Sequence, residues 1–171
     1  MIPLMKLFFQ IMSESTLHRE LVTCMANYVK ENYSNFMIVT DLQEKPGDDT
    51  PPNIDGYRPD LFATLANSPD FLRTNKANDY RGKEKHYIIG EAKTSGDLKT
   101  KRSEMQISSF LSYLNNQRVS SFILSVPYQS GDEAKSRLNF WCKEFNFLIN
   151  DCIVFDQCDC WRLEDSLWHL S

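Results

Sequence analysis

The stretch from Tyr87 to Lys93 constrains the fold of this chain most, because an apolar run leads directly into an acid and a base. The run from Tyr87 to Ile89 is typical of a buried strand. Residues i and i+2 of a strand point to the same face of a sheet, so Glu91 and Lys93 are expected side by side, with Ala92 turned to the other face. The sequence therefore predicts a strand whose end carries a carboxylate and an ammonium group together.

A second acid directly precedes another apolar run. Asp60 follows Pro59 and precedes the run from Leu61 to Ala63. If the two strands pair, the carboxylate of Asp60 comes beside that of Glu91. Mg²⁺ is usually held by a few carboxylates together with waters and phosphate oxygens. Two carboxylates and Lys93 on adjacent strand ends therefore indicate a divalent-metal site for phosphate chemistry.

The succession of Pro59-Asp60 and then Glu91-x-Lys93 resembles the PD-(D/E)XK nuclease superfamily. The resemblance covers roughly residues 15 to 126. It implies a restriction-endonuclease-like core, in which a helix and three strands are followed by a crossover helix and a further strand. It also implies a nuclease that hydrolyses the phosphodiester bonds of nucleic acid, with DNA as the expected substrate, RNA as the alternative, and Mg²⁺ or Mn²⁺ as the cofactor.

The resemblance also assigns roles to individual residues. Asp60, Glu91 and the carbonyl of Ala92 are expected to bind the metal, with Glu20 as a further acid from the first helix. Lys93 is expected to orient or deprotonate the attacking water, or to hold the phosphate. From the residues alone, Glu91 and Lys93 also fit an ordinary charged pair at a strand end. Glu20 lies at the edge of an apolar helix face and also fits a solvated carboxylate.

Gln106 is a further candidate catalytic residue. Superfamily members related to the exonuclease domains of bacterial recombination enzymes carry Gln-x-x-x-Tyr on the helix after the lysine strand. Here Phe110 stands in the place of the tyrosine, and Tyr113 lies about one turn further on, nearer the face of Gln106. This departure weakens the assignment to that subfamily and leaves a surface glutamine as the alternative.

A basic segment follows the candidate site at once. Lys99, Lys101 and Arg102 stand at the expected start of a helix, where the helix dipole does not favour cations. We therefore expect them to contact the phosphate backbone of a nucleic acid, with a solvated first helical turn as the alternative. The net charge of −4 means that any nucleic-acid footprint is local.

The order of periodic segments predicts one α/β domain over residues 1–171, with a mixed central sheet flanked by helices and a C-terminal α-β extension beyond the nuclease-like core. The expected helices are 13–31, 97 or 100 to 115, and 131–148, and the expected strands are 36–42, 54–64, 86–93, 118–126 and 152–155. Residues 1–12 are interpreted as a packing arm and 66–85 as a long polar loop. Asp55, directly before Gly56, is expected to belong to a turn, with a further acid of the site as the alternative.

Composition excludes several classes of protein. No apolar run reaches the roughly 18 residues of a membrane span. The five cysteines are odd in number, so a disulfide scaffold is not expected, and a reducing cytoplasm fits best. Spacing does not favour a zinc site at the C-terminal cysteines. His18 and His86 lack a partner pattern and are interpreted as packing or surface residues.

Two other interpretations of the whole chain stay open. One is a catalytically inactive domain of the same fold that binds nucleic acid or a protein partner. The other is an unrelated α/β protein in which the carboxylates of Asp60 and Glu91 lie far apart. The oligomeric state is also open, a homodimer included.

Overall fold

A six-stranded mixed sheet forms the centre of the protein, with strand order β1-β2-β3-β4-β5-β6. The computed structural model describes residues 14–42, 49–65, 86–117, 119–147, 151–156 and 160–162. The strands are β1 (Phe36–Thr40), β2 (Leu61–Leu65), β3 (His86–Ala92), β4 (Val119–Ser125), β5 (Asp151–Phe155) and β6 (Cys160–Arg162). The expected N-terminal arm and polar loop lie outside the described residues.

The sheet combines antiparallel and parallel pairing. β1, β2 and β3 form an antiparallel meander, β3, β4 and β5 are parallel, and β6 returns antiparallel to β5. The helices α3 (Lys101–Asn115) and α4 (Gly131–Glu144) make the crossovers between the parallel strands. The expected α/β class and mixed sheet are therefore confirmed.

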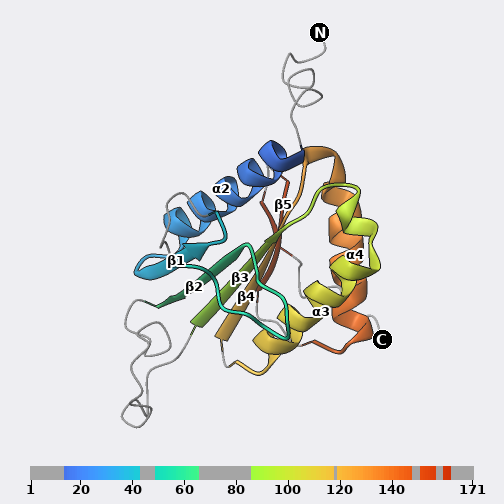
Figure 1. The fold of residues 1–171 in the computed structure, drawn as a ribbon. Coiled ribbons are helices and arrows are strands. Elements are labelled where there is room, and N and C mark those ends of the chain that lie inside the picture. The colour runs from blue at the N-terminus through green and yellow to red at the C-terminus, as the bar shows by residue number, and fades with distance from the viewer. Residues whose placement is uncertain are drawn as a thin grey trace.

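Helices cover both faces of this sheet (Figure 1). The long helix α2 (Glu14–Asn32) packs Met25 and Val29 against Ile88 on one face. α3 and α4 pack on the other face, where Ile107 and Leu138 belong to one cluster with Phe62, Ile89 and Leu124. Alternation along each strand explains this division, since neighbouring residues point to opposite faces. In β3 the odd-numbered residues therefore face α3 and α4, and the even-numbered residues face α2.

Gly90 allows α2 to approach β3 closely. A Cβ atom built on Gly90 would overlap the sulfur of Met25 and would lie 3.1 Å from the Cβ of Leu61. Both neighbours are fully buried. A side chain at this position would therefore have to displace a packed core, which explains a glycine in the middle of a central strand.

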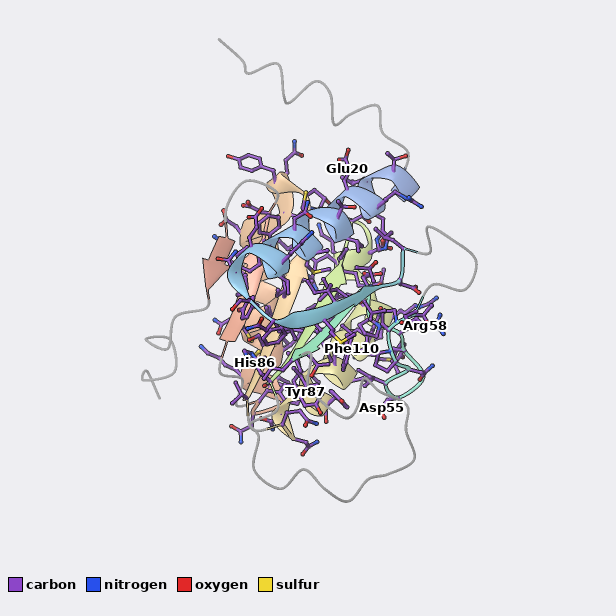
Figure 2. The ribbon with its side chains drawn as sticks, turned by 90° about the vertical axis from the view of Figure 1, so that its left-hand side faces the viewer. Glu20, Asp55, Arg58, His86, Tyr87 and Phe110 are labelled. Atoms are coloured by element: carbon purple, nitrogen blue, oxygen red, sulfur yellow. The ribbon has the colours of Figure 1, made fainter. Side chains whose placement is uncertain are left out.

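The second strand is shorter than expected. The sequence predicts residues 54–60 as part of it, but β2 begins only at Leu61. Asp55 and Gly56 have positive φ values of 51° and 87°, and they form a tight turn between Ile54 and Tyr57, which bridge to each other. An Asp-Gly pair favours this turn type because both central residues need positive φ. The turn explanation of Asp55 is confirmed, and Figure 2 shows Asp55 at the tip of this loop.

Candidate functional site

The candidate site lies at the end of the two inner strands β2 and β3, where β3 ends and β2 begins. The antiparallel register pairs Leu61 with Gly90, so Asp60, one residue before β2, comes beside Glu91. Both acids are buried, with 8% of Asp60 and 2% of Glu91 exposed. The structure therefore brings together the two carboxylates that the sequence predicted to meet, although 31 residues separate them.

Each of the four carboxylate oxygens has a protein partner. Oδ1 of Asp60 lies 3.1 Å from Nε2 of His18, and Oδ2 accepts the N–H of Ala92 at 2.8 Å. Oε1 of Glu91 lies 2.8 Å from Nζ of Lys93, and Oε2 accepts the N–H of Asp60 at 3.3 Å. The acids are thus joined to each other through the backbone of both strands.

Gln106 completes the cluster from α3. Its Oε1 accepts a hydrogen bond from Nζ of Lys93 at 2.8 Å. The Lys93 side chain is only 11% exposed, so its ammonium group is held between Glu91 and Gln106. The structure places Gln106 against Lys93, as expected for a residue of the site rather than a free surface glutamine.

Burial and repulsion dominate the electrostatics of Glu91. Burial raises the pKa of Glu91 to about 8, the charge of Asp60 adds to the rise, and the Lys93 ammonium opposes it. The hydrogen bond to Asp60 raises the pKa of His18 above its usual 6.5, against the lowering effect of burial. Two acids in one buried position repel each other, and such a pair is an arrangement that a bound cation relieves.

His18 is the residue that sequence reasoning missed. The sequence pattern indicates a packing or surface residue, whereas the structure places His18 against Asp60. A signal was present, because His18 belongs to the helical series with Leu21, Val22 and Met25, all fully buried. A polar residue on an otherwise apolar stripe needs a polar partner when its helix packs.

Glu20 does not lie beside the other candidate residues in the structure. Successive residues of a helix are about 100° apart, so Glu20 lies about 200° around the axis from His18, which faces Asp60. Figure 2 shows Glu20 on the side of α2 turned away from the sheet. Its charge acts instead on Cys24, one turn on, where burial and Glu20 both raise the thiol pKa.

The atoms of the cluster that could bind a metal ion are several oxygen atoms and one nitrogen atom, that of His18. The N–H of Lys93 bonds the carbonyl of Ser125 in β4, so the N–H and C=O of Ala92 both point the other way, toward Asp60. The oxygen atoms of Asp60, Glu91 and Ala92 therefore lie at the same end of the sheet, with the His18 imidazole beside Asp60. Within the described part of the chain, no three His, Cys, Asp or Glu side chains are already arranged to hold a metal ion.

The residues expected to contact nucleic acid lie on the surface at the start of α3. Lys99 pairs with Glu133 of α4 at 3.4 Å, and Lys101 pairs with Glu104 at 2.6 Å. Arg102 is exposed. Lys99 belongs to a short 3-10 turn, η2 (Asp97–Lys99), and Thr100 caps α3 by accepting the N–H of Ser103. The charges of Lys99 and Lys101 are therefore partly compensated by neighbouring acids.

Comparison with known proteins identifies no relative of this chain. No family model, no curated protein and no solved structure gives a significant match. Among the helices that the structure describes, none is long and apolar enough to cross a membrane.

Proposed function

We propose that this chain is a Mg²⁺- or Mn²⁺-dependent nuclease with a restriction-endonuclease-like core, with DNA as the proposed substrate and RNA as the alternative. The observation that supports it best is the cluster of Asp60, Glu91 and Lys93 at one end of the sheet. The element order and the sequence pattern of the PD-(D/E)XK superfamily agree with this cluster. An oxygen-rich buried pair of acids also suits hard divalent cations.

The acids of the chain hold the metal in this proposal. Asp60, Glu91 and the Ala92 carbonyl supply oxygen atoms, and His18, whose side chain is 38% exposed, supplies a nitrogen on the accessible side. A bound divalent cation neutralises phosphate charge and lowers the pKa of a coordinated water. Glu20 is omitted from the proposed ligands because it lies on another side of α2.

Lys93 binds the phosphate group in the same proposal, and Gln106 positions Lys93. The hydrogen-bond acceptors around Nζ of Lys93 suit an ammonium donor. Gln106 restricts where that ammonium can point. We therefore assign Lys93 to charge stabilisation of the phosphate and the leaving oxygen, and Gln106 to positioning Lys93.

A catalytically inactive nucleic-acid- or protein-binding module of the same fold is the second candidate. It is favoured by the fact that all four oxygens of Asp60 and Glu91 already have protein partners. In such a module the cluster would be a permanent buried network. It would stabilise the join between β2 and β3 and would not respond to metal.

Cleavage assays distinguish the two candidates. The purified protein is incubated with single- and double-stranded DNA and RNA in Mg²⁺, in Mn²⁺ and in chelator. We expect metal-dependent cleavage that is lost in Lys93→Met and retained in Lys30→Ala, at an exposed lysine of α2. Absence of cleavage on every substrate with both metals would favour the binding module.

A further inference from the structure

Part of the backbone of β1 points away from β2, toward the outer edge of the sheet. Asp41 donates its N–H to the carbonyl of Asp60 in the continuation of the β1–β2 register. Hydrogen-bonding direction alternates along a strand, so Met37 and Val39 also bond toward β2. The N–H and C=O groups of Phe36, Ile38 and Thr40 therefore point outward, and within the described residues no strand pairs with them.

The residues of β1 themselves lack the features that usually protect an edge strand. Its sequence, Phe-Met-Ile-Val-Thr, contains no charge and no proline, and its pairing with β2 continues in one register over all five residues. Natural proteins usually place lysine, proline or a bulge on an exposed edge to prevent pairing with another chain. An uncharged, regular edge is therefore suited to receive a strand.

We propose that β1 pairs antiparallel with β1 of a second copy of this chain, about a two-fold axis at Ile38. In this register Ile38 faces its own copy, and Phe36 faces Thr40 of the other copy. All the outward N–H and C=O groups of these three residues then find partners. The two central sheets become one continuous sheet, with the two α2 helices on the same face.

Self-complementarity favours a second copy over a different partner. At a two-fold axis the central residue meets its own copy, so a charge there would repel itself, and Ile38 is uncharged. Phe36 extends the apolar surface at this edge, because its ring packs edge-to-face against Tyr33 and His86 at centroid distances of 5.6 and 5.1 Å. Pairing would bury part of this half-exposed aromatic group.

The pairing leaves the candidate nuclease site outside the interface. From the spacing and rise of β-strands, the Glu91 positions of the two copies lie about 30 Å apart, at opposite ends of the joined sheet. Each site is built from one copy alone. The dimer proposal can therefore fail while the nuclease proposal holds, and the reverse.

Charge substitutions at Ile38 provide the test. Sedimentation equilibrium of the full chain, from micromolar to millimolar concentration, should show a reversible dimer for the original protein. Ile38→Lys and Ile38→Glu should each be monomeric at the same concentrations, and an equimolar mixture should regain dimer, since opposite charges then meet at the axis. Phe140→Lys, at an exposed residue of α4, is the matched control and should remain dimeric.

Substitutions at Ile38 could prevent folding, because its side chain is partly packed against the core. A second variant therefore tests the same interface without changing Ile38. Thr40→Pro removes one outward N–H and no bond to β2, which an edge strand tolerates. Circular dichroism should show a folded protein, and sedimentation should show a monomer. A monomeric original protein throughout the concentration range, or dimers in the folded Ile38 or Thr40 variants, would overturn the proposal.

Discussion

At the scale of single residues, the unusual ionisation of Glu91 makes the stability of the protein depend on pH. Its pKa is raised from 4.5 to about 8 in the folded state, chiefly by burial. Between these two values the folded state keeps a proton that the unfolded state has lost. The free energy of unfolding therefore falls as pH rises through this window, by at most about 1.4 kcal/mol per pH unit.

The substitution Glu91→Gln should remove this pH dependence. Glutamine resembles the protonated acid, so the variant should match the original below the window and exceed it in stability above, in metal-free buffer. Urea unfolding of both proteins at pH values below, within and above the window measures the difference. A constant difference across the whole range would mean that Glu91 ionises normally.

Asp60→Asn separates a functional acid from a structural one. Asparagine keeps an oxygen for the N–H of Ala92 but removes the charge that faces Glu91 and His18. Cleavage should be lost, while metal-free stability should stay equal or rise by about 1 kcal/mol, because functional sites often trade against stability. Thermal melts measure the second effect. A loss of roughly 2 kcal/mol would identify Asp60 as a structural partner of His18 and Ala92.

At the scale of elements, the contact between α2 and β3 depends on Gly90. Gly90→Ala introduces a Cβ into space occupied by Met25 and Leu61. Over-packing of this kind usually costs about 1–3 kcal/mol. We expect a loss of that size in chemical denaturation, and the double variant with Met25→Ala should lose less stability than the sum of the two single variants, because the two side chains occupy the same space. A neutral Gly90→Ala variant would show that α2 moves freely from the sheet.

The start of α3 is the expected border of the nucleic-acid surface. Arg102→Ala should weaken binding to DNA and reduce the slope of log affinity against log salt by about one unit, as should Lys99→Ala. Lys30→Ala, at the far end of α2, is the control and should leave the slope unchanged. Binding titrations over a range of salt concentration measure this slope for each variant. Equal slopes in all variants would place both residues on a surface that nucleic acid does not contact.

At the scale of the whole molecule, the sequence predicted the class of fold and the meeting of Asp60 with Glu91. Strand periodicity was sufficient because β2 and β3 are adjacent in the sheet and apolar on both faces. It failed at residues 54–60, where positive φ at Asp55 ends the extended conformation. The contact between His18 and Asp60 depends on how α2 crosses the sheet, and no local pattern specifies that crossing.

The prediction for Glu20 depended on the resemblance and on its place at the edge of an apolar face. An acid at such an edge can face either the core or the solvent, and the rotation of α2 decides between them. That rotation is set by the close packing of Met25 on Gly90, a tertiary contact. It brings His18, and not Glu20, to the end of the sheet.

Metal binding should couple the site to the stability of the whole fold. A ligand that binds only the folded state stabilises it by mass action, so Mn²⁺ should raise the melting temperature. Below pH about 8 the ion must displace the proton of Glu91, so less Mn²⁺ should be needed as pH rises toward that value. Thermal melts over a grid of Mn²⁺ concentration and pH measure this coupling.

The variant Asp60→Asn is the control for this experiment, and its melting temperature should respond weakly to Mn²⁺ at every pH. An equal response in both proteins would place the metal elsewhere, and no response in either would favour the inactive module.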